Sequence, residues 1–144
     1  MDIASVCLVG QICRYDGQAF EDDYIKQLYE QGKVIAVCPE ILAGLTAPRS
    51  PCEIIGGEGS DVLAGKAKVV DAEGEDQTAA FIKGAFLALA IAKAQGTKCA
   101  YLKSKSPSCG CGIIYDGSFS GKLMSGDGVT SSLFDQNGIK VIQV

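Results

Sequence analysis

The sequence predicts an α/β fold in which a mostly parallel sheet is flanked by helices. Short all-apolar runs, typical of strands buried on both faces of a sheet, alternate with stretches that have the apolar spacing of helices. The 144 residues suit one hydrophobic core, and no low-complexity linker divides them. We therefore expect a single domain, residues 1–144, of the Rossmann-like kind.

The first half of the chain supplies two expected strands and one helix. Ile3–Val9 is an apolar run closed by Gly10, and Val34–Val37 is a second such run, so both are predicted to be buried strands. Between them, residues 21–31 have the i, i+4 apolar spacing of an amphipathic helix. Residues 39–54 hold three of the four prolines and are predicted to form an irregular loop with one helical turn.

The second half alternates in the same way. Residues 53–70 carry four glycines between β-branched pairs, which predicts a hairpin or a flexible flap. A helix capped by Asp76 or Thr78 is predicted to run to Gln95, and because it is apolar on nearly all sides we expect other elements to cover it. The remaining expected elements are a strand, a second strand, a short helix and a last strand: Ala100–Lys103, Ile113–Tyr115, Thr130–Gln136 and Ile139–Val144.

Composition and charge exclude several classes of function. The net charge is −4 and the 13 basic residues form no run, so a polymeric nucleic acid is not an expected partner. No apolar stretch reaches the roughly 18 residues of a membrane span, and the start of the chain lacks a secretory layout. We expect a cytoplasmic protein with no membrane partner. The absence of histidine excludes His-ligated zinc and Ser-His or Cys-His nucleophile pairs.

Three of the seven cysteines are expected to meet at one edge of the sheet. Cys7, Cys38 and Cys109 each lie at or after the end of a different predicted strand, and parallel sheets bind ligands beyond the carboxyl ends of their strands. A cysteine is often only a small buried hydrophobe. Cys38 and Cys109, however, lie in loops with little apolar company, where burial explains them poorly. In a reducing compartment, disulfides are also poor candidates.

Thiols without histidine or a Cys-x-x-Cys pair favour an iron-sulfur cluster over structural zinc. Glycines beside Cys109 let the backbone approach a bulky cluster. Cys111 could be a fourth ligand, but in an extended chain it points away from Cys109. Ligation by the three thiols alone would leave one iron open as a Lewis acid, which fits catalysis better than electron transfer. The other cysteines are expected to be packing residues: Cys13, Cys52 and Cys99.

A reaction at an open iron needs a base nearby. Glu40, two residues after Cys38, is the candidate general base, since the chain has no histidine. An acid that merely begins a helical turn, favoured by the helix dipole, is the alternative, and both stay open. Ser106 and Ser108 bracket Pro107 and could orient a water or bond the backbone.

Seven stretches of the chain resemble a known bacterial family in order and over nearly the whole length. They are CLVGQICRYDG from Cys7, VCPE from Val37, GLTAPRSPCEI from Gly44, FIKGA from Phe81, LKSKSPSCG from Leu102, IYDGSFSGKL from Ile114 and GDGVTS from Gly126. The family is the one catalogued as domain of unknown function 523, whose characterised members are thiouracil desulfidases. The resemblance is specific for the family and less specific for the substrate.

The resemblance implies a 4Fe-4S cluster held by Cys7, Cys38 and Cys109, with the fourth iron free to take the sulfur of a thiocarbonyl. The family's catalytic glutamate and serine would fall on Glu40 and Ser106, although the serine could shift to Ser104 or Ser108. Two departures from the family pattern are Cys52, where a small residue is usual, and Cys13. Neither touches the implied ligands.

The hypothesis that follows is a non-redox hydrolysis of thiouracil to uracil and hydrosulfide. The substrate sulfur would bind the open iron while Glu40 takes a proton from a water positioned by Ser106. Four residues are candidates to bind the thiopyrimidine, although a charged residue in a rim loop is often only solvated: Arg14, Asp16, Lys103 and Ser108.

Two other classes of protein compete with this interpretation. One is a nucleotide- or small-molecule-binding module with structural cysteines, because GGEGSDVLAG at residues 56–65 superficially resembles a phosphate loop. That segment lacks the closing Gly-Lys followed by Ser or Thr, and it does not clearly join a strand to a helix. The other class is a thiol redox protein, which the lack of a Cys-x-x-Cys at a helix start disfavours.

Overall fold

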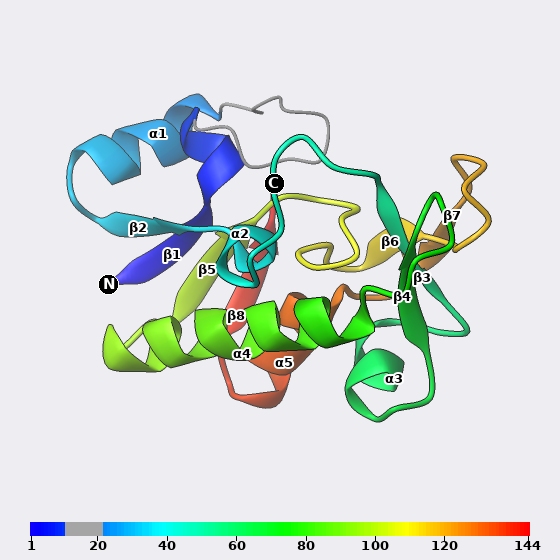
Figure 1. Cartoon of the computed structure of the whole chain (residues 1–144). Coiled ribbons are helices and arrows are strands. Elements are labelled where there is room, and N and C mark those ends of the chain that lie inside the picture. The colour runs from blue at the N-terminus through cyan, green and yellow to red at the C-terminus, as the bar shows by residue number, and fades with distance from the viewer. Residues whose placement is uncertain (11–21) are drawn as a thin grey trace.

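A computed structural model describes residues 1–10 and 22–144. Its main sheet has four strands in the order β2-β1-β5-β8, and all three neighbouring pairs are parallel. Figure 1 shows the two small antiparallel sheets, β3-β4 and β6-β7, together on one side of this main sheet. The elements are β1 Asp2–Ser5, η1 Val6–Val9 (a 3-10 helix), α1 Asp23–Glu30, β2 Val34–Val37, α2 Pro39–Leu42, β3 Cys52–Ile55, α3 Gly59–Leu63, β4 Lys68–Asp71, α4 Thr78–Ala94, β5 Cys99–Leu102, β6 Ile113–Tyr115, β7 Leu123–Ser125, α5 Val129–Gln136 and β8 Lys140–Gln143.

The two faces of the main sheet bury separate apolar clusters. Successive side chains of a strand point to opposite faces, and Ile3 and Ala100 join a cluster with the buried sides of α4 and α5. Ala4 joins the second cluster, with Leu8 of η1 and Ile25 of α1. Helices therefore cover both faces (Figure 1), which confirms the predicted α/β class with its mostly parallel sheet.

The strand order creates a switch point between β1 and β5. The chain passes from β1 to β2 on one side and later crosses to β5 on the other side of β1. Ligands of open parallel sheets bind at such a point, beyond the carboxyl ends of the strands. A ligand site is therefore expected among the loops that leave β1, β2 and β5.

The first strand is shorter than the sequence predicts. Of the apolar run Ile3–Val9, only the start belongs to β1, and Val6–Val9 turns into the 3-10 helix η1. Gly10 ends this turn in the left-handed region, at φ 90°, which suits a residue without a Cβ. Cys7, Leu8 and Val9 are nevertheless buried. The apolar run therefore predicts burial correctly and the strand conformation of these residues incorrectly.

The segment 53–70 is a hairpin, as one of the two predictions had it, but it contains a helix. β3 pairs antiparallel with β4, and α3 lies between them. The strand β7 was not expected; it pairs with β6 to form the second hairpin.

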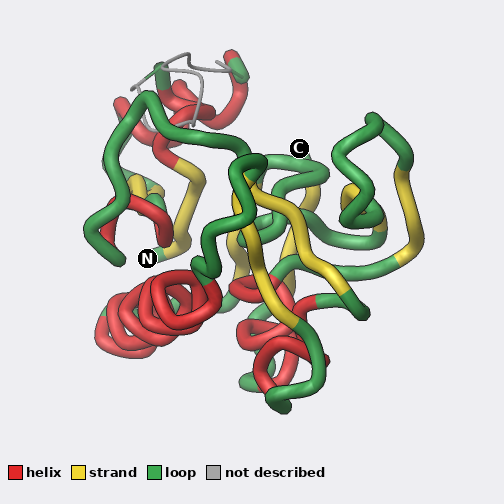
Figure 2. The backbone as a smooth tube through the Cα atoms, turned by 45° about the vertical axis from the view of Figure 1, so that its right-hand side comes forward, coloured by secondary structure: helices red, strands yellow, loops and turns green. Residues whose placement is uncertain are grey.

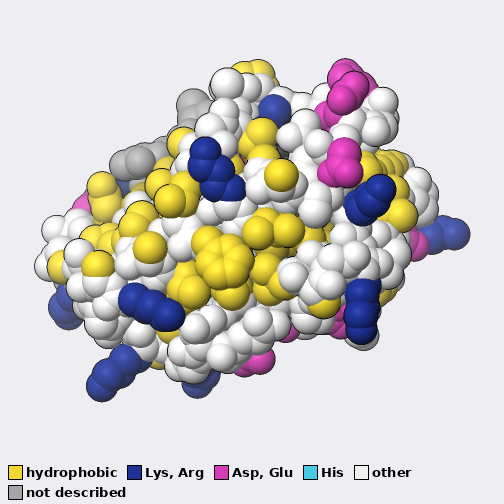
Figure 3. Space-filling model, turned by 60° about the horizontal axis from the view of Figure 1, so that its bottom comes forward, with side chains coloured by type: hydrophobic (Ala, Val, Ile, Leu, Met, Phe, Trp, Pro, Cys, Tyr) yellow, Lys and Arg dark blue, Asp and Glu magenta, His cyan; other side chains and the backbone are white. Residues whose placement is uncertain are grey.

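The long helix α4 is less covered than its apolar composition predicts. Phe86 and Leu87 are exposed, at 52% and 38%. Figure 3 views the molecule from below, where apolar side chains gather on the surface. The other side of the helix is buried through Phe81, Ala85 and Ala88. Among the described residues, no helix has the length and apolar character needed to cross a membrane.

Candidate functional site

A cavity of about 480 Å³ lies at the carboxyl ends of β1, β2 and β5. Its walls come from η1, the start of α2, the loop 103–109, the segment 49–53 that enters β3, and the β6-β7 hairpin. Figure 2 shows the two hairpins with their loops after a turn that brings this side forward. The volume falls in the range of roughly 300–1,000 Å³ that is usual for small-molecule sites.

Cys7, Cys38 and Cys109 all line this cavity. Cys7 lies on η1 directly after β1, Cys38 follows β2 as the residue before α2, and Cys109 lies in the loop after β5. Because β2, β1 and β5 are neighbours in the sheet, three adjacent strands deliver one thiol each to the same space. The predicted convergence of the three thiols on one edge is therefore seen.

The expectation that Cys38 and Cys109 have little apolar company was wrong. Cys109 is 7% exposed and belongs to the cluster under α4 and α5, and Cys38 packs against the second cluster. The loops look polar in sequence, but they are folded back over the ends of the sheet, so their thiols meet core residues that are distant along the chain. Cys7 is also buried, at 3% exposure.

The remaining described cysteines differ from these three. Cys52 also lines the cavity, and burial, followed by the charge of Asp71, raises the pKa of its thiol to about 11. Cys99 and Cys111 do not line the cavity. Burial, followed by the charge of Asp127, raises the pKa of Cys111. Cys13 lies outside the described residues.

The loop around Cys109 is turned, whereas the prediction that Cys111 points away from Cys109 assumed an extended chain. The Gly110 N-H donates to the Ser106 carbonyl over 2.8 Å. A Cβ on Gly110 would lie 2.7 Å from that same carbonyl oxygen, so glycine is needed where the turn closes. The turn, and not strand alternation, separates Cys109 from Cys111.

The N-terminus of α5 holds the Cys109 loop in place. The N-H groups of Val129 and Thr130 donate to the carbonyls of Pro107 and Ser108, each over 2.8 Å. The buried Ser131 hydroxyl donates to the Cys109 carbonyl over 2.7 Å. The first N-H groups of a helix have no partner within the helix, and here the loop that carries the thiol supplies their acceptors.

Ser106 and Ser108 play different parts in that loop. The Ser106 hydroxyl oxygen accepts the N-H groups of Ser108 and Cys109, over 3.0 and 3.1 Å, and it lines the cavity. Both contacts use its oxygen as acceptor, so the hydroxyl can still donate to a ligand. Ser108 is 1% exposed, and its hydroxyl contacts Thr130 Oγ1 at 2.9 Å and Cys109 Sγ at 3.7 Å.

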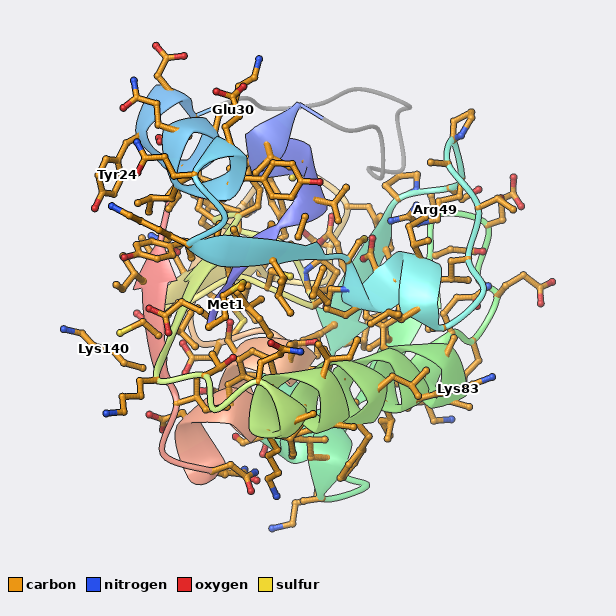
Figure 4. The ribbon with its side chains drawn as sticks, turned by 90° about the vertical axis from the view of Figure 1, so that its left-hand side faces the viewer. Met1, Tyr24, Glu30, Arg49, Lys83 and Lys140 are labelled. Atoms are coloured by element: carbon orange, nitrogen blue, oxygen red, sulfur yellow. The ribbon has the colours of Figure 1, made fainter. Side chains whose placement is uncertain are left out.

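The position of Glu40 is compatible with both roles that the sequence left open, a general base and an acid at a helix start. It lies in the first turn of α2 and also lines the cavity. Arg49 forms an ion pair with its carboxylate and donates to the Thr46 carbonyl over 2.7 Å. The two side chains are only 17% and 9% exposed, and Figure 4 labels Arg49 beside α2.

The helix α2 lies directly on α4. A Cβ on Gly84 would be 2.1 Å from the Pro39 carbonyl oxygen, so only glycine allows the two helices to approach this closely. Pro39 and Glu40 begin α2 and line the cavity, so this contact fixes their position relative to α4. The glycine belongs to the FIKGA stretch quoted above.

Lys103 lines the cavity, and its ammonium donates to the Ser104 hydroxyl over 3.2 Å. Arg14 and Asp16, the other charged residues predicted to bind substrate, lie outside the described residues. Sequence reasoning missed Arg49 as the partner of Glu40, and it missed Tyr115 and Phe119 as cavity residues. A lone aromatic residue among Ser and Gly in SFSG was the available signal for Phe119.

The donor set suits a metal cluster and not a single ion. Within residues 1–10 and 22–144, no three His, Cys, Asp or Glu side chains come close enough to hold one metal ion. The three thiols instead stand around a cavity, and a cluster of several irons spreads its ligands more widely than one ion does. Thiolates are the usual ligands of such clusters, so these residues fit the group.

The glycine-rich segment 56–65 does join a strand to a helix, contrary to the sequence-based interpretation. It links β3 to α3, but α3 has only five residues. The Glu58 N-H donates to the Asp61 carboxylate over 2.9 Å, and Glu58 accepts the Asp127 N-H over 3.2 Å. Carboxylates therefore occupy the place that a bound phosphate would need, which argues against a phosphate loop.

Comparisons with known proteins cover nearly the whole chain. Residues 3–144 match the model of a family described as 2-thiouracil desulfurase. Uncharacterized protein YbbK of Bacillus subtilis (strain 168) is 48% identical over 142 residues, which are 99% of this chain and 94% of that protein. The solved structure of 4Fe-4S-dependent thiouracil desulfidase TudS matches with a TM-score of 0.86 and 42% identity, over 99% of this chain and 89% of that one.

Proposed function

Because the chain belongs to the 2-thiouracil desulfurase family, we propose that it is a 4Fe-4S-dependent enzyme that converts a thiolated pyrimidine to its oxo form and hydrosulfide. The observation that carries the proposal is the meeting of three thiols, from three adjacent strands, in a cavity that Glu40 also lines. The solved relative with a TM-score of 0.86 is named as an enzyme of this cofactor and substrate.

Cys7, Cys38 and Cys109 are the proposed ligands of the cluster. When bound by three thiolates, such a cluster offers an iron with an open position, a Lewis acid toward a thiocarbonyl sulfur. The chain's own contribution is to fix the thiols. Cys7 is held on η1, Cys38 at the start of α2, and Cys109 on a loop that α5 clamps through its first N-H groups.

Glu40 and Ser106 are the proposed catalytic residues. Glu40 takes a proton from water, and the hydroxide adds to the ring carbon that carries sulfur. Carbon-sulfur cleavage then leaves the oxo base and hydrosulfide, so no electrons enter or leave. Ser106 lines the cavity with a hydroxyl that can donate to the water, and Arg49 holds the Glu40 carboxylate in place.

The substrate is proposed to be a small thiopyrimidine of the thiouracil type. The residues proposed to bind this substrate are Lys103, Ser108, Arg14 and Asp16. Neither a polymeric nucleic acid nor a membrane is part of this proposal. We place the enzyme in the cytoplasm, since unligated thiols persist best in a reducing compartment.

Anaerobic reconstitution with iron and sulfide tests the ligands and the reaction together. The wild-type protein is expected to gain the broad visible absorbance of an iron-sulfur cluster and to release hydrosulfide from 2-thiouracil or 4-thiouracil. Cys109→Ala is expected to lose both, whereas Cys111→Ala, in the same loop but outside the cavity, keeps both. Wild-type protein with a full complement of iron and sulfide that leaves both thiouracils intact would refute the proposed reaction.

Glu40→Gln tests the base separately from the cluster. A general base contributes on the order of 10²- to 10⁴-fold to a rate, so kcat should fall by that order while iron and acid-labile sulfide per chain stay at wild-type values. Full activity in this variant would show that another group takes the proton.

A further inference from the structure

Two residues of the cavity wall adopt a backbone conformation that side chains disfavour. Among the described residues, the non-glycine positions with positive φ are Lys105, at 70°, and Phe119, at 56°. Both line the cavity. Left-handed backbone is unusual for a bulky residue and concentrates at functional sites, where the surrounding structure must enforce it.

Phe119 lies in the loop between β6 and β7 and is not a core residue. It is 37% exposed and faces a cavity, whereas Phe81 and Phe134 are fully buried in the apolar core. The loop is closed by the Asp116 N-H, which donates to the Lys122 carbonyl over 3.0 Å. Packing of the core therefore does not explain why an aromatic side chain stands at this position.

A buried carboxylate fixes the loop that carries Phe119. Glu53 of β3 is only 9% exposed, and its Oε1 accepts the N-H groups of Gly117 and Phe119, over 2.9 and 3.2 Å. A Cβ on Gly117 would lie 2.5 Å from the Ile54 carbonyl oxygen, so the loop lies directly on β3. Figure 1 shows the two hairpins side by side. Hydrogen bonds to a charged acceptor are among the stronger ones.

The position of the ring suits a flat ligand. Phe119 and Tyr115 contribute aromatic side chains to the wall of the same cavity that the thiols Cys7, Cys38 and Cys109 line. A pyrimidine ring has a π face, and stacking on an aromatic side chain is a common way to bind one. A ring placed against Phe119 leaves its edge substituents to meet the polar groups of the cavity.

We propose that Phe119 is the platform on which the ring of the thiopyrimidine stacks, and that Glu53 holds this platform in place through the loop backbone. The inference rests on the proposed function and adds to it the residue that selects a planar aromatic substrate. Binding at Phe119 uses the ring and not the sulfur. Uracil should therefore bind there as well, even to protein without a cluster.

Three variants test the platform. Phe119→Ala removes the ring, Phe119→Tyr keeps it, and Phe86→Ala removes an exposed phenylalanine of α4 that does not line the cavity. Two quantities are measured: KM and kcat for thiouracil in the cluster-loaded enzyme, and Kd for uracil in cluster-free protein by ligand-observed NMR. Far-UV circular dichroism checks that each variant is folded.

Phe119→Ala is expected to raise both KM and Kd roughly 5- to 160-fold, the range that corresponds to the loss of one base-aromatic stack, with a smaller change in kcat. Phe119→Tyr, which keeps an aromatic ring, should bind both ligands more tightly than Phe119→Ala does, and Phe86→Ala should stay within about twofold of wild type. If the wild type is active but Phe119→Ala has the same KM and Kd as the wild type, the proposed role of Phe119 is wrong and the proposed reaction is unaffected. An inactive wild type overturns the proposed reaction, and weakened uracil binding by Phe119→Ala would then still support the platform.

Discussion

Arg49 determines where the Glu40 carboxylate points. Its guanidinium pairs with that carboxylate and is itself held by the Thr46 carbonyl at 2.7 Å. Both partners are largely buried, and a planar guanidinium gives such a pair a defined geometry that a lysine cannot reproduce in full. A base must stand within hydrogen-bond reach of the water that it deprotonates, so Arg49 is a positioning residue for the proposed reaction.

Arg49→Gln is expected to lower kcat on the order of 10- to 100-fold, because small displacements of a catalytic group have effects of that size. KM and the iron content per chain should change little, and Arg49→Lys should restore part of the rate. Steady-state kinetics of reconstituted protein measures this. Lys83→Gln, on the exposed side of α4 (Figure 4), is the control. A wild-type kcat in Arg49→Gln would show that Arg49 does not position the base.

Cys52 is expected to lower the free energy of unfolding as the pH rises into the alkaline range. Its pKa is raised from 9.0 to about 11, chiefly by burial. Between these values the unfolded chain loses the thiol proton while the folded protein keeps it, so the folded state binds more protons and stability falls as pH rises. Below pH 9 the thiol is protonated in both states and contributes no such dependence.

Replacing the thiol should remove this dependence. The free energy of unfolding of the wild type is expected to fall relative to that of Cys52→Ala between pH 8 and pH 11, as measured by urea denaturation at both ends of the interval. Cys52→Ala differs from the wild type at a single titrating group, so other alkaline effects cancel in the comparison. A difference between the two proteins that stays constant with pH would contradict the raised pKa.

At the scale of elements, α5 acts as the support of the Cys109 loop. Ser131 and Ser132 are neighbours in this helix and are both buried, at 1% and 5% exposure. The Ser131 hydroxyl donates to the Cys109 carbonyl, whereas the Ser132 hydroxyl has no hydrogen-bond partner among the described residues. The two serines thus form a matched pair for measuring what the support contributes.

Ser131→Ala is expected to lower the free energy of unfolding by about 1–3 kcal/mol, because it removes the buried hydroxyl that donates to the Cys109 carbonyl. It should also reduce the iron retained per chain after reconstitution. Ser132→Ala removes a hydroxyl without a partner and should be neutral or stabilising. Equal losses of stability in both variants, measured by urea denaturation, would show that the Ser131 contact does not support the loop.

The elements that the sequence predicted well are those whose character is local. Val34–Val37 is a strand as predicted, since an all-apolar run bounded by polar residues needs little else to define it. Ile3–Val9 failed in part because apolar residues indicate burial, and a strand and a 3-10 turn bury them equally well. The short β7, Leu123–Ser125, exists through its pairing with β6, which local patterning does not reveal.

The candidate site also has features that the sequence predicts and features that it does not. The meeting of Cys7, Cys38 and Cys109 was predictable because the carboxyl ends of parallel strands share one edge. The pairing of Arg49 with Glu40 and the seat of Phe119 on Glu53 were not, because they depend on how loops fold over that edge. The resemblance to the family indicated the residues of these stretches but not their contacts.

For the whole molecule, the fold is expected to persist without the cluster. Each face of the main sheet buries its own apolar cluster, and fully buried side chains such as Phe81, Phe134 and Ile3 do not depend on a metal. That residues 1–144 form a single desulfidase-like domain stays a prediction, and cooperative unfolding of the cluster-free protein would support it.

A variant with serine at Cys7, Cys38 and Cys109 should bind no iron yet retain the far-UV circular dichroism of the wild type and a single unfolding transition. Single replacements at Cys99 and Cys111, outside the cavity, are the controls and should retain iron. Loss of cooperative unfolding in the triple variant alone would show that the cluster organises the fold, as structural zinc does in small domains.

The position of β1 between β2 and β5 has a consequence for biosynthesis. Cys7 and Cys38 are synthesised early. Cys109 follows β5, which pairs with β1, and its loop is held by α5, which is synthesised later still. In a nascent chain that stops before α5, the loop that carries Cys109 lacks its support, and β5 lacks its neighbour β8. The complete set of proposed ligands therefore forms only after α5 has been synthesised, and we expect the cluster to enter late in the maturation of the protein.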